Sequence, residues 1–581
     1  MTETTVGREP VQIVEIKQPF CSLSFGVSPC TARGTGPVKC YNTRSTCQDG
    51  ANYAATTLSL FFSRGRVGEQ TVSGATYIIP SLVSVSTSPT RLNVGGSRTD
   101  ASGLGNRALC TLTFNDHTHT DRVVDKYVDE RGFDPLTRGT FWTKWKARNR
   151  YRQNIQIIVY DGYAGQTLAQ MSKKVFFLDN IQGPDDSGQV TIQGKDVLAR
   201  LEERKAQVPL ASPGVLYTSI TNSQTSFVVA GALVADYTAT GTLRIDSEIM
   251  TYTGRATHAN GVEFTGVTRG TDRSTAATHS VDASVQQCYR VTNKRIDDTL
   301  KELLNVYGGV PLTYLDTVGW KAEVDTYLSL WQLNALITVP TAVHDLVSSI
   351  QEQTLVNCWW DEKNLLVKMR SIRGVDALPP LITEENNIIA GSFVMREKPE
   401  ERVSQVWIYY DQRDKTRGKE ETANYASLIT VANLPEELLY GEPSVRKIFG
   451  NFLSAGALAS TTASKIITRY IHSPSEIEFR MDAKDRDKWV GDVVRIRHSA
   501  DRDEFGDYRI RQWLIVAADE VEPGETVHYI AEDITLYGKI YYIMAAGSAN
   551  YPGAGLAPEK SGYIGNSAGL LSDGASAARI S

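Results

Sequence analysis

The stretch Gly491-Asp-Val-Val-Arg-Ile-Arg-His498 alternates apolar and charged residues with a period of two. In an extended strand this period puts Val494 and Ile496 on one face and Arg495 and Arg497 on the other. The same kind of pattern recurs in segments spread over the whole chain, at 11–16, 174–178, 189–193, 403–410 and 526–530. These segments predict a protein built mainly from β-strands.

Helical periodicity is confined to a few short segments. The first carries five apolar residues at the i, i+4, i+7, i+8 spacing of a one-sided helix: Ile296, Leu300, Leu303, Leu304 and Tyr307. A second helix is predicted from about 341 to 352, and a third, short one around Val197 to Leu201. The predicted fold class is therefore mainly β with minor α.

Composition and charge exclude several classes of protein. The 581 residues include 61 Lys and Arg against 66 Asp and Glu, for a formal net charge of −5. A protein that coats nucleic acid needs many uncompensated basic residues, so this class is excluded. With 41% hydrophobic and 22% charged residues, the chain has the composition of a folded protein. At about 100–200 residues per domain, its length predicts three to five domains.

Shifts in composition suggest where the domains end. Residues 1–55 hold a group of cysteines, the part near 206–290 is rich in Thr, Ala and Gly, and the end is rich in Gly, Ala and Ser. We expect six segments: a cysteine-rich segment at 1–55, a β domain at 56–205, a small inserted β module at 206–290, an α/β piece at 291–400, a second β domain at 401–545 and an extended tail at 546–581.

The hydropathy of the chain predicts no stable membrane insertion. Its start has no basic stretch followed by a long apolar core, as a secretory signal would. The apolar run at 540–546 is among the longest, far below the ~20 residues of a membrane-spanning helix. We therefore expect folding in a cytoplasm, where disulfides are uncommon and a dense cysteine group more often binds metal or does redox chemistry.

Four of the seven cysteines form the pattern Cys21-x8-Cys30-x9-Cys40-x6-Cys47. Four thiolates suit either a tetrahedral zinc ion or a four-iron cluster. No C-x2–4-C pair of the structural zinc type is present, and the long, glycine-containing spacers favour an iron–sulfur cluster over zinc. Free buried thiols or two disulfides remain open alternatives. The isolated Cys110, Cys288 and Cys358 are predicted to be core residues.

The x8 and x6 spacings, with Tyr41-Asn-Thr-Arg-Ser-Thr-Cys47-Gln-Asp in the last loop, resemble the iron–sulfur segment of siphophage tail-tip proteins of the lambda type. The hub proteins of gene transfer agents are similar. The resemblance implies a [4Fe–4S] cluster held by Cys21, Cys30, Cys40 and Cys47, acting as a structural staple. In the lambda type this segment follows the hub domain, whereas here it lies at the N-terminus with a shorter middle spacer.

Three further motifs resemble tail hub proteins of long-tailed phages: Gly139-Thr-Phe-Trp-Thr-Lys-Trp-Lys-Ala-Arg-Asn149, Val190-Thr-Ile-Gln-Gly-Lys-Asp-Val-Leu198 and Trp359-Trp-Asp-Glu-Lys-Asn-Leu-Leu-Val-Lys-Met-Arg-Ser-Ile-Arg373. The resemblance implies tandem tail-tube-like hub β-barrels at 56–205 and 401–545, with an α/β hub piece between them.

The family role that this resemblance implies is structural. Three copies would form a ring at the end of the tail tube, joined to the distal tail ring protein, the tape measure protein and central fibre or receptor-binding tail proteins. The ring would act in attachment and DNA ejection, with phage DNA passing through it without sequence-specific binding. The expected location is the virion tail tip, after assembly in the host bacterial cytoplasm.

Two polar motifs each allow a binding interpretation and a purely structural one. His117 and His119 would lie on one face of a strand and look like a metal site, but no third ligand is identifiable, and we favour an incidental pair. Lys144-Trp-Lys-Ala-Arg-Asn-Arg-Tyr-Arg152 interleaves basic and aromatic residues as single-strand binders do. A solvated face with aromatic anchors is the favoured interpretation, with contact to a neighbouring subunit as an alternative.

No enzymatic signature is found in the sequence, which has no H-E-x-x-H, G-x-S-x-G or Walker-type loop. Asp361 and Glu362 would point to opposite faces of a strand, and they suit the turn of a hairpin better than one site. We therefore expect no enzyme, with a cell-wall-degrading tail enzyme as a weak alternative. A receptor- or glycan-binding tail protein is the other alternative, through the 206–290 module, for which a structural decoration is an equal interpretation.

Overall fold

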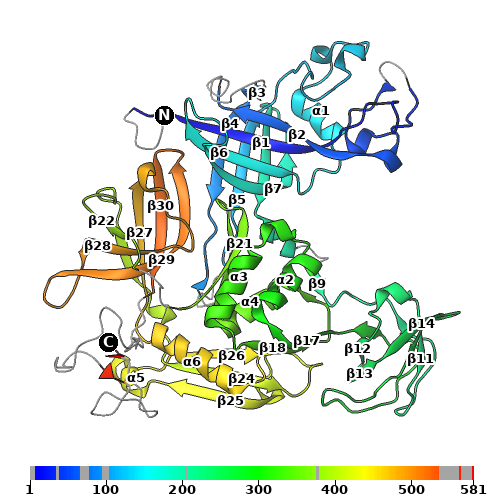
Figure 1. The fold of residues 1–581 in the computed structure, drawn as a ribbon, viewed down its shortest axis with the longest axis vertical. Helices are drawn as coiled ribbons and strands as arrows, with labels where there is room; N and C mark the ends of the chain where they lie inside the picture. The colour runs from blue at the N-terminus through cyan, green and yellow to red at the C-terminus, as the bar shows by residue number, and fades with distance from the viewer. Residues whose placement is uncertain are drawn as a thin grey trace.

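A computed structural model describes residues 7–34, 38–65, 77–94, 104–202, 206–373, 378–534, 562–563 and 579–580. This part of the chain is mainly β, with six α-helices and several separate sheets (Figure 1). The predicted fold class is confirmed at this level. None of the described helices is long and apolar enough to cross a membrane. The predicted tail at 546–581 lies outside the described residues, except for a short pairing of 562–563 with 579–580.

The N-terminal domain is built on an eight-stranded sheet in the order β3-β2-β1-β6-β7-β8-β5-β4. Its strands are β1 (Pro10–Cys21), β2 (Ala55–Ser63), β3 (Ile78–Ile79), β4 (Leu82–Ser88), β5 (Leu109–Asn115), β6 (Gln156–Tyr163), β7 (Ser172–Gln182) and β8 (Gln189–Lys195). The helix α1 (Phe141–Arg148) covers one face with Phe141, Trp142 and Trp145. The opposite face joins the large core of the rest of the molecule, so the central strands are apolar on both faces.

The inserted module has two small sheets and a core of its own. Its strands are β10 (Val215–Leu216), β11 (Phe227–Ala230), β12 (Gly241–Ile245), β13 (Glu248–Tyr252), β14 (Gly254–His258), β15 (Gly261–Thr265) and β16 (Val285–Gln287). Phe264 lies at the centre of this core, with the rings of Phe227, Tyr237 and Tyr252 around it. The module leaves the body of the protein between β9 (Gln207–Val208) and β17 (Tyr289–Arg295).

The middle of the chain carries helices, as predicted. They are α2 (Ile296–Glu302), which continues as a π-helical turn at 303–307, α3 (Thr317–Tyr327) and α4 (Val343–Thr354). The short strands beside them are β18 (Gln332–Ile337), β19 (Thr341–Ala342), β20 (Val356–Asp361) and β21 (Leu366–Ser371). The third predicted helix is a 3-10 turn at Val197–Glu202.

The C-terminal part contains two sheets. One has the order β25 (Tyr425–Ala432), β24 (Gln405–Gln412), β26 (Val445–Gly450), with α6 (Gly456–Tyr470) against one face. The helix α5 (Leu434–Tyr440) follows β25. The other sheet has the order β22 (Leu381–Thr383), β28 (Val493–Arg502), β29 (Tyr508–Glu522), β30 (Thr526–Asp533), β27 (Ser475–Asp482), β23 (Val394–Glu397). The alternating stretch at 491–498 enters β28, with Val494 and Ile496 buried.

The prediction of closed tail-tube-like β-barrels at 56–205 and 401–545 is wrong for the described residues. A barrel needs strands that pair at both edges of the sheet. The eight-stranded sheet ends at β3 and β4, which are not paired with each other, and β3 has only two residues. The six-stranded sheet ends at β22 and β23, with three and four residues. Every sheet in the described ranges is therefore open.

The N-terminal and C-terminal sheets share one apolar core, which also includes the middle helices. The segment after β4 reaches into the C-terminal part, where the Leu92 amide donates to the Val516 carbonyl at 2.9 Å. The Tyr470 hydroxyl of α6 donates to the Val94 carbonyl at 2.9 Å. The body of the protein is thus continuous, while the loops at one end of the N-terminal sheet and the inserted module project from it (Figure 1).

Candidate cysteine site

The four clustered cysteines lie together at the end of the N-terminal sheet. Cys21 is the last residue of β1, and Cys47 directly follows a 3-10 turn at Arg44–Thr46. Cys30 and Cys40 lie in the loops between them. We call residues 21–54, together with the 121–131 loop that packs against them, the cysteine lobe.

All four of these thiols line one small pocket. Its other lining residues are Leu23, Phe25, Ala32, Asn42, Gln48, Asp49, Asn52 and Tyr53. All seven cysteines of the chain are free thiols, and none of the four in the pocket is joined in a disulfide. In the described ranges no three His, Cys, Asp or Glu side chains gather as a site for a single metal ion.

Burial shapes the chemistry of the Cys40 thiol. Burial raises the pKa of Cys40, the backbone of Asn42 opposes this shift, and the other three thiols of the pocket raise the pKa further. The other three cysteines thus lie near enough to Cys40 for their charge to disfavour its ionised form. Four thiols around one pocket are the type of donor that a metal or cluster takes, but in the described residues they are not gathered closely enough to hold a single ion.

A buried arginine fixes the Cys40 loop. The Arg131 side chain is fully buried and forms a two-point ion pair with Asp125, at 2.7 Å from Nε to Oδ2 and 2.8 Å from Nη2 to Oδ1. Its Nη2 also donates to the Cys40 carbonyl at 2.9 Å, and its Nη1 to the Lys39 carbonyl. One guanidinium therefore ties the 121–131 loop to two consecutive backbone carbonyls, those of Lys39 and Cys40.

The next residue, Tyr41, connects this clamp to α1. The guanidinium carbons of Arg131 and Arg148 lie 3.9 and 4.0 Å from the centre of its ring. The Thr43 hydroxyl donates to the Arg148 carbonyl at 2.6 Å, and the Arg150 amide donates to Ser45 Oγ at 2.8 Å. The loop between Cys40 and Cys47 is thus held by the C-terminal end of α1.

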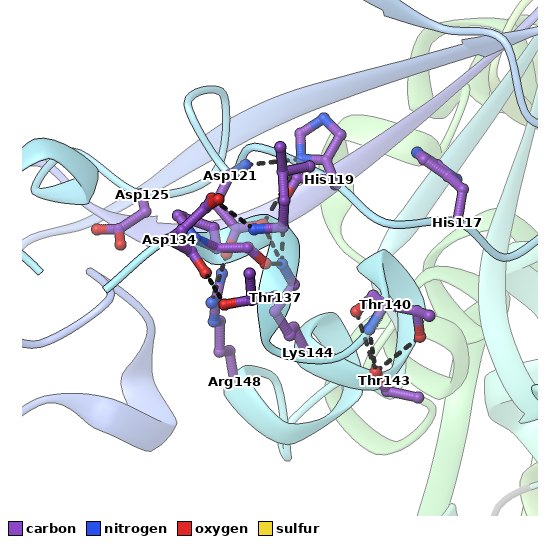
Figure 2. Close-up of polar contacts among 12 residues, drawn as sticks. His117, His119, Asp121, Asp125, Asp134, Thr137, Thr140, Thr143, Lys144 and Arg148 are labelled. Carbon is purple, nitrogen blue, oxygen red and sulfur yellow. Dashed lines mark hydrogen bonds and ion pairs between the residues drawn. The ribbon is translucent and has the colours of Figure 1, made fainter. Parts of the chain in front are cut away.

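Asp121 organises the charges beneath this contact (Figure 2). Its carboxylate forms ion pairs with Lys144 at 2.8 Å and with Arg148 at 2.6 Å, both on α1. Its backbone amide donates to His119 Nδ1 at 3.0 Å. Burial acts to raise the pKa of Asp121, but His119, Lys144 and Arg148 outweigh it and hold the pKa well below its usual range. Asp121 is therefore a fixed anion that orients Arg148 towards Tyr41.

The two histidines singled out in the sequence pack against an aromatic ring. His117 stacks on Phe141 with an interplanar angle of 6°, and His119 meets the same ring edge-on. Burial lowers the pKa of His117. Figure 2 shows that only His119 contacts the Asp121 network. Neither belongs to a cluster of three ligating side chains within the described ranges.

The basic and aromatic segment at 144–152 divides between core and surface. Trp145 is buried in the N-terminal core, whereas Tyr151 is 71% exposed. Lys144 and Arg148 pair with Asp121 and are not free to contact a nucleic acid. The predicted aromatic anchor is present in Trp145, whereas Lys144 and Arg148 are mostly buried and do not form a solvated face.

The Asp361-Glu362 pair lies at the β20–β21 hairpin, as predicted. Asp361 Oδ1 accepts from the Lys363 and Asn364 amides and thus closes the turn, while Glu362 points to Thr90 and Trp489. The isolated Cys358 is buried, and burial raises its pKa to about 12. Such a thiol stays protonated near neutral pH and is a poor nucleophile.

The clamp residues Asp125 and Arg131 were missed by the sequence reasoning. They lie in a polar stretch with Lys126, Asp129 and Glu130, where nothing separates a buried arginine from exposed neighbours. The stacking of Tyr41 between two arginines depends on segments about 90 and 107 residues apart. Only the fold brings these segments together.

Comparison with solved structures finds distant likenesses to tail proteins. A tail protein from Neisseria meningitidis aligns over 75% of this chain and 91% of its own, with 8% identity and a TM-score of 0.37. The 43 kDa tail protein of prophage MuSo2 from Shewanella oneidensis aligns over 78% and 98%, with 11% identity and a TM-score of 0.34. A chain of a native gene transfer agent particle aligns over 58% and 92%, with 10% identity and a TM-score of 0.31. No protein-family model and no curated protein matches the sequence.

Proposed function

We propose that this chain is a structural component of the tail tip of a long-tailed phage or a related particle. It would act as a hub that ends the tail tube and links it to the distal tail ring and the central fibre proteins. The observation that carries the proposal is the cysteine pocket, because four cysteines with tail-tip-like spacing line one cavity. The order of the hub-like motifs between 139 and 373 supports the same role.

The cofactor proposed for this pocket is a [4Fe–4S] cluster held by Cys21, Cys30, Cys40 and Cys47, with zinc as the alternative. When bound, such a group supplies cross-links between the end of β1 and the loops around it, and its binding free energy becomes folding free energy. The cysteine lobe has a need for such links, because its own apolar core consists of Phe25, Cys40 and Tyr127. The proposed role is therefore a structural staple.

The partners follow from the proposed role. Three copies would form a ring that contacts the tail tube, the distal tail ring protein, the tape measure protein and central fibre or receptor-binding proteins. Phage DNA would pass through this ring during ejection. The chain would assemble in the bacterial host and reside at the tail tip of the virion.

Metal analysis of the full chain tests the cofactor. Protein purified without oxygen should contain iron and acid-labile sulfide in equal amounts, and Cys40→Ala should lose both. Cys110→Ala is the control, since Cys110 is also a buried thiol but lies in the separate core under α1, and this variant should keep the iron. Zinc without sulfide would mean that the pocket holds a zinc ion in place of the cluster. Wild-type protein that contains neither iron nor zinc would refute the structural staple.

The particle itself tests the hub. Labelled antibody against the inserted module should bind at the distal end of assembled tails, and particles without this chain should have no closed tail tip. Label along the tube or on the head would refute the hub role. Analytical ultracentrifugation of the purified chain measures whether three copies associate.

A further inference from the structure

The helix α5 and the turn after it, which we call the α5 arm (residues 434–442), expose an apolar surface to water. Leu434, Leu438 and Leu439 are 58%, 82% and 81% exposed. All three lie on one helix of seven residues, so they form a patch and are not scattered single side chains. Exposed apolar patches mark surfaces that bind another molecule.

The α5 arm is also acidic. It carries Glu436, Glu437 and Glu442, and within the described residues none of these carboxylates forms an ion pair. Glu437 is held by two neutral side chains. The nearby Arg402 is buried, lies over the Tyr440 ring and donates to the Glu442 carbonyl, so its charge is turned away from the surface. The arm therefore combines exposed leucines with unpaired negative charge.

A surface of the opposite charge lies beside the C-terminal end of α1. It is a hollow of about 590 Å³ lined by 150–154 and 178–181, which we call the basic groove. Its exposed aromatic ring is that of Tyr151. Its one carboxylate, Asp179, is paired with Lys195 at 3.1 Å. The hollow has the size of sites that seat several apolar and polar groups at once.

The arginines of the basic groove have no carboxylate of their own. Within the part of the chain that the structure describes, Arg150 and Arg152 form no ion pair, and Arg152 donates to the Asn149 carbonyl at 3.3 Å. A second hollow of about 190 Å³ shares three lining residues with the groove and adds Arg200, which donates to the Gly309 carbonyl at 3.1 Å. A guanidinium binds a carboxylate through two parallel hydrogen bonds, so this surface suits an acidic segment.

The two surfaces are complementary, but one chain does not bring them together. Figure 1 shows α1 and α5 at opposite ends of the molecule. The arm of one chain can therefore meet the groove of another chain. We propose that the α5 arm docks into the basic groove of a second copy, with its carboxylates at the arginines of the groove and its leucines against Tyr151.

Such a contact joins two unlike surfaces, so it repeats head to tail and closes into a ring where the rotation allows. It deepens the ring of three copies and rests on that proposed function. The Arg150 amide donates to Ser45 Oγ, so the groove adjoins the cysteine lobe. In the ring, the α5 arm of each copy would lie beside the cysteine lobe of the next.

Sedimentation of the full chain tests the interface through exposed charges, whose reversal leaves the core intact. Wild-type protein should associate beyond the dimer. Arg150→Glu in the groove and Glu442→Lys on the arm should each weaken association by at least about tenfold, because like charges then meet. Arg509→Glu is the matched control: it reverses an exposed arginine on β29, outside both surfaces, and should associate like wild type.

A mixture of the two variants tests the head-to-tail direction. The Arg150→Glu chain keeps its arm and the Glu442→Lys chain keeps its groove, so at a concentration where each alone is monomeric the mixture should form dimers and nothing larger. A monomeric wild type, wild-type association in both variants, or a mixture that stays monomeric would overturn the interface. A monomeric wild type that still occupies the distal end of tails would overturn the interface alone, whereas absence from the tail tip would refute the hub.

Discussion

The cysteine lobe and the inserted module are two small projections that are stabilised in different ways. Fourteen buried apolar or aromatic side chains form the core of the module. The described part of the cysteine lobe has three, Phe25, Cys40 and Tyr127. In place of a core, the lobe has four thiols around a pocket and a fully buried arginine on its loop carbonyls. A small lobe without sufficient apolar burial depends on cross-links and ion pairs.

The dependence of the cysteine lobe on its buried ion pair is tested most directly at Arg131. Arg131→Met leaves Asp125 buried without its cation, and removal of one partner of a buried ion pair costs roughly 3–5 kcal/mol. In the presence of a metal chelator, the thiols of Cys40 and Cys47 in this variant should react with a maleimide about a hundredfold faster, or more, than in wild type. Exchange in the inserted module should not change. Unchanged labelling would show that the lobe is held without the clamp.

The module should respond to loss of apolar volume instead. Leu243 is fully buried at the centre of its core, and Leu→Ala at such a site costs about 2–5 kcal/mol. Leu243→Ala should therefore raise hydrogen exchange throughout 215–287 and leave thiol labelling in the cysteine lobe as it is in wild type. A variant that loosened both projections equally would mean that they unfold as one unit, against the separate cores in the structure.

The sequence predicted six of the strands and two of the helices, because these depend on local periodicity. The segments near 174–178, 189–193 and 526–530 all lie within strands that the structure contains. The helix α6 was missed in a segment assigned to strands, since its buried positions include the small Ala459, Thr462 and Ala463. Small residues give little apolar contrast, so the helical period of α6 is weak in the sequence.

Other features depend on contacts that no local pattern encodes. Closure of a barrel depends on which strands form the two edges, and here the edge strands β3, β22 and β23 are too short to pair around a barrel. The spacing of the cysteines singled out the four thiols that line the pocket. The clamp of Asp125 and Arg131 was not predictable, because a buried charge has the same sequence signature as an exposed one until the fold supplies its partner.

The stability of the inserted module in acid should depend on Glu248, with a smaller effect than the loss of Leu243. Burial acts to raise the pKa of Glu248, but Arg269, the Ala277 amide and His279 outweigh it, and the pKa falls to about 2. A lowered carboxyl pKa means that its stabilisation is present above about pH 4.5 and is lost as the pH falls towards 2. Protection in the module should thus drop by at most about tenfold per pH unit below pH 4.5. Glu248→Gln should remove this dependence, and an identical slope in the variant would exclude Glu248 as its source.

The smallest expected effect separates the clamp from ordinary surface charge. Arg122 lies in the same loop as Arg131 and pairs with Asp129 at 3.8 Å, but its side chain is 76% exposed. An exposed ion pair contributes roughly 0–1 kcal/mol, because water and salt screen it and both side chains lose freedom. Arg122→Met should therefore change thiol labelling of the lobe by less than about fivefold, whereas Arg131→Met changes it by about a hundredfold or more. Equal effects of the two variants would show that the lobe responds to net positive charge, and only a large difference between them ties its order to the one guanidinium that holds the Lys39 and Cys40 carbonyls.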